Sequence, residues 1–326
     1  MSRAKNKIMK PNIVLSECIN LKPVRYNGGI INDPFTNILG QYVHYNPVCP
    51  EVAIGLGVPR DRVKVVRTGK QDFCLVQPSK GLDLTQKINC FSENFLNSLT
   101  DIDGFLLKSK SPSCCVSGTK TYANRDGTGF LYRGKGVFAR KVIQKFPLLP
   151  CEDEKRLEDT DTRHHFLTRI FSLFELRKKF KNLSTIKQIR GFHNKYRYLI
   201  MAYNQTRFKK LERIARSKEN ESIQEVKKDY QQEFFKAFLR KPRTQSQAYV
   251  LRQIFKDLSE YLSPEEKQYF LDLLEKFEKK IVPVLIPVRF FRNLAHQYEK
   301  DGWQKYLNSY PEELIDFNLS ALQKSE

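Results

Sequence analysis

Apolar and polar positions follow two different patterns along the chain. Up to about residue 140, short apolar runs alternate with Gly and Pro, and three runs have the length and composition of buried strands, namely 12–15, 63–66 and 105–107. The Gly and Pro positions between the runs predict turns. Strands mixed with helical stretches predict an α/β N-terminal domain with a small, Rossmann-like open sheet.

Beyond about residue 160 the apolar residues recur every three or four positions, which predicts helices. One such series includes Leu183, Ile186, Ile189 and Phe192. The stretch 263–266, Ser-Pro-Glu-Glu, has the form of a capping box with Pro at the first helical position, and we expect prolines 283 and 287 to interrupt the pattern that follows it. The C-terminal domain is therefore expected to be all-α.

A change in composition separates the two patterns. Pro147 and Pro150 precede the acidic stretch 152–154, which is typical of a linker. We therefore expect an N-terminal domain at 1–146, a linker at 147–160 and a helical domain at 161–326, and the length of 326 residues favours two domains over one.

The formal net charge of +21 is unevenly distributed. Residues 1–150 contain 22 Lys and Arg against 10 Asp and Glu, residues 163–218 contain 16 against 2, and residues 219–326 contain 17 against 18. A basic run can simply be a solvated helix face, but so few acidic residues over 163–218 favour a polyanionic partner, either nucleic acid or an anionic membrane surface. Because we find no apolar run long enough to span a bilayer and no signal-peptide core, we expect a cytoplasmic protein. The basic stretch also lacks a clear amphipathic face rich in Trp and Leu, so we expect no membrane partner.

Seven cysteines occur in a chain for which we expect a reducing compartment, so a disulfide framework is improbable. Cys18, Cys49 and Cys114 lie near the ends of predicted strands, where the loops of an open sheet converge. Three thiolates suit a soft metal or an iron–sulfur cluster. No closely spaced cysteine pair of the Cys-x-x-Cys kind is present, and burial as small apolar side chains remains the alternative.

The residues around these cysteines resemble the thiouracil desulfidase (TudS-like) family. The resemblance covers roughly residues 11–145 and is carried by several motifs in the same order: Ser-Glu-Cys at 16–18, Arg-Tyr-Asn-Gly at 25–28, Cys-Pro-Glu at 49–51, the stretch 55–60 and the stretch 107–114. The rest of the chain resembles the YbgA-type C-terminal domain often fused to this module, over the stretches 146–150, 163–174, 192–202 and 310–314. The fused arrangement resembles bacterial enzymes that remove sulfur from 4-thiouridine in tRNA.

The resemblance implies a [4Fe–4S] cluster held by Cys18, Cys49 and Cys114, with one iron left for the substrate sulfur, and no nucleotide cofactor. Water would replace the sulfur, which leaves as hydrosulfide. Glu51 is our first choice for the general acid–base, Ser111 and Ser113 for orienting the water or the base, with Ser111 preferred, and Arg25 and Tyr26 for substrate contact. Two positions depart from the family, because Leu21 and Cys115 replace glycines, so we expect altered loop geometry and a competing Cys115 thiol.

The basic part of the helical domain supplies candidate contacts for tRNA phosphates. These are Arg169, Arg177, Lys178, Lys179, Arg190, His193, Lys195, Arg197, Lys209, Lys210 and Arg213. The interleaved aromatics at helical spacing are expected to be core rather than stacking platforms.

Three functions remain open at this point: a tRNA 4-thiouridine desulfidase, a desulfidase of free thiouracil or another thioamide, and a non-enzymatic iron–sulfur RNA-binding protein. The oligomeric state is not indicated by the sequence.

Overall fold

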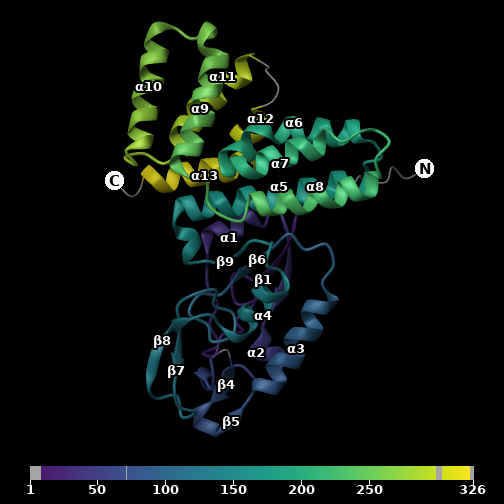
Figure 1. Cartoon of the computed structure of the whole chain (residues 1–326). Coiled ribbons are helices and arrows are strands. Elements are labelled where there is room, and N and C mark those ends of the chain that lie inside the picture. Colours follow the sequence, from purple (N-terminus) through teal and green to yellow (C-terminus); the bar gives the residue numbers. More distant parts are fainter. Residues whose placement is uncertain (1–8, 71, 299–302, 324–326) are drawn as a thin grey trace, which may run out of the picture. The chain divides into compact units, whose positions relative to one another are not determined.

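The computed structural model describes residues 9–70, 72–298 and 303–323. The chain divides into two compact units, residues 1–166 and 167–326. Strands occur in the first unit, and every described element of the second is a helix (Figure 1). The predicted fold class, an α/β region followed by an all-α region, is confirmed.

A four-stranded parallel sheet forms the centre of the first unit, in the order β2-β1-β6-β9. Its strands are β1 (Asn12–Ser16), β2 (His44–Val48), β6 (Gly104–Leu107) and β9 (Cys151–Asp153). Ile13, Val14 and Leu15 of β1 are fully buried, which explains the uninterrupted apolar run. Strand β9 and a short 3-10 helix, Arg156–Glu158, lie inside the segment 147–160 that we expected to be a linker.

A second sheet has the order β5-β4-β3-β7-β8, so the first unit holds two sheets where the sequence indicated one. Only β3 pairs in parallel with β7, and the other neighbours are antiparallel. Its strands are β3 (Lys64–Arg67), β4 (Phe73–Gln77), β5 (Leu82–Asp83), β7 (Thr119–Tyr122) and β8 (Phe130–Gly134).

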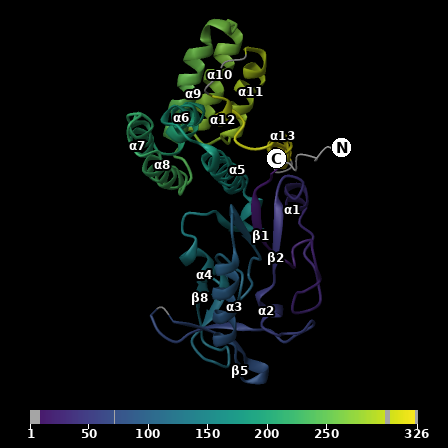
Figure 2. The same ribbon diagram turned by 90° about the vertical axis from the view of Figure 1, so that its right-hand side faces the viewer.

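Helices α3 (Thr85–Ser98) and α4 (Val137–Lys145) lie side by side (Figure 2). Their apolar faces pack with Val14 and Phe105 of the parallel sheet in one cluster, to which Phe138 contributes a fully buried ring. Two shorter helices, α1 (Pro34–Leu39) and α2 (Pro50–Ala53), begin with Pro after β-region residues. Burial of these faces holds the sheet, and with it the loops at the strand ends, in place.

The predicted helices are present in the second unit. The capping boxes of α6 and α10 form with Thr185–Gln188 and Ser263–Glu266. Pro283 precedes α11, but Pro287 lies within its first turn, where the missing N–H has no intrahelical acceptor to lose. The helices are α5 (Thr160–Asn182), α6 (Ile186–Tyr203), α7 (Gln205–Ala215), α8 (Ile223–Ala237), α9 (Thr244–Leu258), α10 (Pro264–Glu278), α11 (Leu285–Tyr298), α12 (Gln304–Leu307) and α13 (Glu312–Gln323).

Aromatic side chains form the core of the helical unit. Phe192 and Tyr196 stack with ring centroids 4.6 Å apart, and Phe180 stacks on Tyr230 at 5.3 Å. All four are buried, so the expectation that the interleaved aromatics are core is confirmed for Phe192 and Tyr196, whereas Tyr198 is half-buried. Within the described ranges, no helix is both long enough and apolar enough to cross a membrane.

Candidate functional site

The three cysteines follow the carboxyl ends of neighbouring parallel strands. Cys49 comes directly after β2, Cys18 lies two residues after β1, and Cys114 lies in the loop after β6. Parallel strands end at the same sheet edge, and all three residues line one cavity of about 500 Å³ in the first unit. The convergence expected from the strand ends is therefore present.

The turn that carries Cys18 is stabilised by Asn20. Asn20 adopts the left-handed conformation (φ 60°), its side-chain amide donates to the carbonyl of Asp33 at 2.7 Å, and its Oδ1 accepts the Asp33 N–H at 2.7 Å. Leu21 is not among the described residues with positive φ. The replacement of the family glycine by Leu21 therefore costs no backbone strain, because Asn20 takes the strained position.

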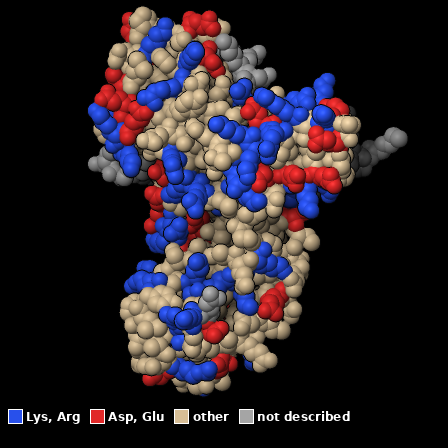
Figure 3. All heavy atoms as spheres, in the orientation of Figure 1, with Lys and Arg blue, Asp and Glu red and all other residues tan. Residues whose placement is uncertain are grey.

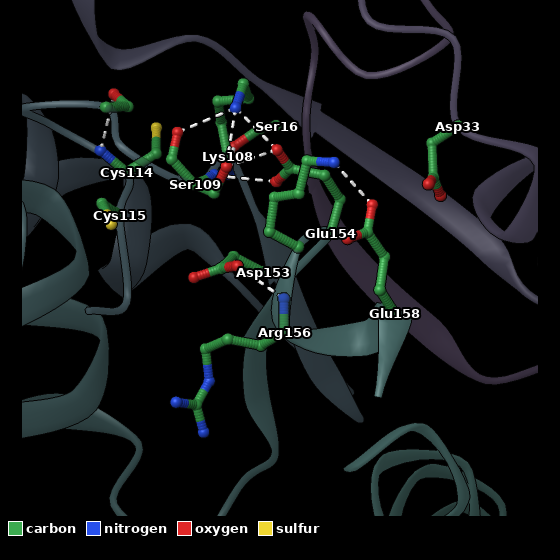
Figure 4. A network of polar contacts seen from close by, with 12 residues as sticks. Ser16, Asp33, Lys108, Ser109, Cys114, Cys115, Asp153, Glu154, Arg156 and Glu158 are labelled. Carbon is green, nitrogen blue, oxygen red and sulfur yellow. Dashed lines mark hydrogen bonds and ion pairs between the residues drawn. The ribbon is translucent and has the colours of Figure 1, made fainter. Parts of the chain in front are cut away.

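The loop that carries Cys114 is organised by a serine turn. The Ser111 hydroxyl oxygen accepts hydrogen bonds from the backbone N–H of Ser113 at 3.2 Å and of Cys114 at 3.1 Å. The Cys115 thiol donates to the carbonyl of Ser117 at 2.7 Å and does not line the cavity. Figure 4 shows the sulfur atoms of Cys114 and Cys115 pointing in different directions.

The three cavity thiols are poor acids in the absence of metal. Burial raises the pKa of Cys18 to about 12, with a further contribution from Cys49, while Lys108 acts in the opposite direction. Burial also raises the pKa of Cys49, against hydrogen bonds from the backbone N–H groups of Val52 and Glu51, and that of Cys114, against a hydrogen bond from Ser16. The thiols are therefore neutral around pH 7 and lose their protons on binding a metal.

Glu51, our choice for the acid–base, lines the same cavity but is not isolated. Its Oε2 accepts hydrogen bonds from Nε and Nη2 of Arg60 at 2.9 and 2.7 Å, and its Oε1 accepts one from the Ser113 hydroxyl at 3.0 Å. The Arg60 and Glu51 side chains are only 5% and 11% exposed, so this two-point ion pair is largely shielded from water. Ser113 rather than Ser111 therefore contacts the carboxylate.

A second buried ion pair lies at the ends of β6 and β9 (Figure 4). The Lys108 ammonium donates to Glu154 Oε1 at 2.6 Å, and the Ser109 hydroxyl and backbone N–H donate to Oε1 and Oε2 of Glu154 at 2.6 and 2.8 Å. The Lys108 N–H donates to the Ser16 hydroxyl oxygen at 2.9 Å. Because Lys108 also lines the cavity, this network ties the start of the cysteine loop to the sheet.

Cations dominate the wall of the cavity. Eight of its lining residues are Lys or Arg and one, Glu51, is acidic. Tyr26 lies between two of them, since the guanidinium carbons of Arg25 and Arg62 are 5.9 and 4.8 Å from its ring centroid and Arg62 donates to its hydroxyl at 2.8 Å. Six of the eight cations form no ion pair within the described parts of the chain: Arg25, Arg62, Lys64, Lys110, Lys120 and Arg133.

The donor set fits an iron–sulfur cluster better than a single metal ion. No group of three or more His, Cys, Asp or Glu side chains among the described residues is arranged to hold one metal ion. The thiolates of a cubane bind different irons and stand further apart, and three thiols around one cavity of about 500 Å³ leave space for such a group.

The basic residues expected to contact RNA divide by exposure. Arg169 and His193 are buried, and His193 Nδ1 hydrogen-bonds the Tyr230 hydroxyl at 3.1 Å, so the proposed RNA contacts leave out both. Arg177 is half-buried. Figure 3 shows Lys and Arg side chains on the visible surface of each unit, with Asp and Glu among them. The exposed candidates are Lys178, Lys179, Arg190, Lys195, Arg197, Lys209, Lys210 and Arg213.

Sequence reasoning missed the partners of the site residues. Arg60 closes the motif at 55–60 but was given no role, and Lys108 and Glu154 were not singled out. Their pairing joins residues 46 positions apart, which no local pattern reveals. The basic cavity wall was visible only as the general excess of Lys and Arg in residues 1–150.

Comparison with known proteins agrees with the sequence motifs. A family model described as 2-thiouracil desulfurase matches residues 13–154, and one described as a protein of unknown function, DUF1722, matches residues 197–311. No curated protein matches the chain. Among solved structures, a [4Fe-4S]-dependent thiouracil desulfidase, TudS, is 30% identical over 45% of this chain and 93% of its own, with a TM-score of 0.37. On the family match and the sequence identity, the chain belongs to the 2-thiouracil desulfurase family, with a DUF1722 region following the desulfurase region.

Proposed function

We propose that the chain is a desulfidase that removes sulfur from 4-thiouridine in tRNA, giving uridine and hydrosulfide, with a [4Fe–4S] cluster held by Cys18, Cys49 and Cys114. The observation that carries the proposal is the meeting of these three thiols at one cavity in a member of the 2-thiouracil desulfurase family. When bound, such a cluster supplies a thiophilic, Lewis-acidic iron that has no protein ligand, which is the chemistry that activates a carbon–sulfur bond toward water.

The residues of the chain supply the proton transfer and the orientation. Glu51 Oε1 accepts a single hydrogen bond, from Ser113, and keeps a lone pair for a proton of the attacking water. Arg60 holds Glu51 Oε2 with two hydrogen bonds, and Ser111 shapes the loop that presents Cys114. Arg25 and Tyr26 also line the cavity, which supports their proposed contact with the substrate.

Charge supports RNA as the carrier of the thiolated base. A free thiouracil is neutral, whereas RNA brings a negative charge with each nucleotide, and six cations of the cavity wall form no ion pair among the described residues. The exposed cations of α5 to α7 offer further phosphate contacts. Free thiouracil is the second candidate, because the similar solved structure is named as a thiouracil desulfidase.

The test measures hydrosulfide release from thiolated tRNA and from free thiouracil by the anaerobically reconstituted chain. Cys49→Ala should lose iron and activity, whereas Cys90→Ala, an exposed cysteine outside the cavity, should keep both. Glu51→Gln should retain the cluster and slow turnover by roughly 10²- to 10⁴-fold. Full iron content and activity in Cys49→Ala would refute the three-ligand site. Release from free thiouracil alone would select the second candidate, and an intact cluster with release from neither would indicate a non-enzymatic RNA-binding protein.

A further inference from the structure

A second cavity lies within the helical unit and is lined by residues 171–311 only. It has a volume of about 420 Å³, which is in the usual range for small-ligand sites. Its wall combines one face of α5 with residues of α6, α12 and the turn before α13. The residues that matter here are Phe171, Phe174, Glu175, Lys178, Lys179, Lys195, Lys305 and Tyr310.

Glu175 organises the cations at one side of this cavity. Lys195 donates to its Oε1 at 3.1 Å, the Tyr196 hydroxyl donates to its Oε2 at 2.9 Å, and Lys305 forms an ion pair with it. Burial alone would raise the pKa of Glu175, but Lys305 and Lys195 outweigh burial and hold it below its usual value. The negative charge of Glu175 is thus balanced by Lys195 and Lys305.

Two further lysines of the cavity have no such partner. Lys178 and Lys179 lie three and four residues after Glu175, one helical turn along α5, and both are exposed. Neither forms an ion pair within the described residues. The wall therefore has four Lys against one Glu, and the ligand that matches this excess is an anion.

The aromatic side chains narrow the class of anion. Phe174 is only half-buried although it lies on a core helix, and the charged groups of Arg177 and Lys178 are 5.7 and 6.0 Å from its ring centroid. Phe171 lies beside Tyr310, with centroids 6.5 Å apart. A bare phosphate would make no use of a ring face. A nucleotide uses both features, because bases stack on aromatic rings and phosphates bind lysines.

We infer that this cavity binds one unstacked nucleotide of an RNA chain, with its base against Phe174 and its phosphate at Lys178 and Lys179. The choice of RNA over a free nucleotide rests on the proposed function. The cavity gives the basic region a specific point of attachment, distinct from general attraction to the exposed cations of α6 and α7.

The test measures tRNA affinity of the full chain at several salt concentrations. Replacing Lys178 and Lys179 together by Ala should weaken binding roughly 10-fold at low salt and reduce the slope of log affinity against log salt by about 1.5. Phe174→Leu, which keeps an apolar side chain at the site, should weaken binding between about 5-fold and about 150-fold with an unchanged slope. The matched controls are the Lys267→Ala, Lys276→Ala double variant and Tyr269→Leu, all on α10 and outside the cavity.

The inference would be overturned if the Lys178/Lys179 variant or the Phe174 variant bound tRNA with the affinity and salt slope of the wild-type chain. Equal losses of affinity in the α10 controls would overturn it too. So would the finding that the wild-type chain does not bind tRNA. The proposed function is judged separately, by hydrosulfide release from thiolated tRNA by the unchanged chain. If the Lys178/Lys179 and Phe174 variants desulfurated tRNA with the KM of the wild-type chain, nucleotide binding in this cavity would be rejected. The proposed function would not be affected.

Discussion

Replacing Glu154 by Ala should destabilise the N-terminal unit by leaving a buried cation unpaired. The carboxylate accepts hydrogen bonds from the Lys108 ammonium and from both the hydroxyl and the backbone N–H of Ser109 (Figure 4). Ala supplies none of these acceptors. The Lys108 ammonium would keep the Ser109 carbonyl and hydroxyl oxygens as acceptors but lose its only opposite charge among the described residues, and both Ser109 donors would lose the carboxylate.

The magnitude follows from the burial of the pair. The Lys108 and Glu154 side chains are 14% and 4% exposed, and removing one partner of such a pair costs about 3–5 kcal/mol. Because Lys108 reaches the solvent-accessible cavity, water can replace part of its lost contacts, and we expect a value near the lower end, ~3 kcal/mol.

Pulsed alkylation of Cys115 during urea unfolding reports on this unit, since that thiol is fully buried in the folded chain. The only Trp, Trp303, lies in the helical unit and serves as the internal reference. Glu158→Ala is the matched control, because its ion pair with Lys155 has side chains 63% and 59% exposed and should contribute less than about 1 kcal/mol.

The double variant Lys108→Met, Glu154→Leu replaces the ion pair by apolar side chains and should recover most of the lost stability. If Glu154→Ala were as stable as Glu158→Ala, the ion pair would not anchor the cysteine loop. The argument would also be contradicted if the loss of stability in the double variant equalled the sum of the losses in Lys108→Met alone and Glu154→Leu alone. Such additivity would show that Lys108 and Glu154 do not interact.

Two further predictions concern titration. In the metal-free chain, the rate of Cys18 alkylation should rise about 10-fold per pH unit between roughly pH 7 and 10 without reaching a plateau. The reason is that only the thiolate reacts and burial raises the pKa of Cys18 to about 12. Peptide-resolved mass spectrometry measures this rate, and a plateau by about pH 9 would contradict the prediction. Burial lowers the pKa of His193 to about 4, so its contribution to folding is present above the unfolded value near 6.5 and is lost as the pH falls toward 4, amounting to roughly 3 kcal/mol in full. In the His193→Gln variant, the stability measured by Trp303 fluorescence should therefore fall less steeply as the pH is lowered. The same pH profile as in the wild-type chain would show that His193 does not cause this loss of stability.

The fold was predictable where a local pattern decides the structure. Buried strands β1, β3 and β6 appear as apolar runs, and α6 and α10 appear through periodicity and capping boxes. Strand β2 was not predicted because it contains His44, Asn46 and Pro47 and is only partly buried. Strand β9 was missed because its neighbours in sequence are prolines and acids, while its pairing with β6 depends on a distant segment.

The candidate site shows the same division. Cysteines after strand ends could be expected to converge, because parallel strands end at one edge. The partner of Glu51 could not be expected, since the sequence places Glu51 near a cysteine but does not show that Arg60 folds back onto it. The sequence also did not show that Asn20, next to the substituted position 21, adopts the left-handed conformation in this turn.

The charge balance of the cysteine cavity bears on the choice of substrate. In the metal-free chain its thiols are neutral, and Glu51 is matched by Arg60. Three bound thiolates would bring three negative charges, yet the six lining cations without an ion pair among the described residues would still exceed them in number. Like charges repel at such short range, so a wall of this kind is stabilised by an anionic ligand. A neutral thiouracil cannot supply that charge and a polynucleotide does, which is the physical reason for proposing RNA as the carrier of the thiolated base.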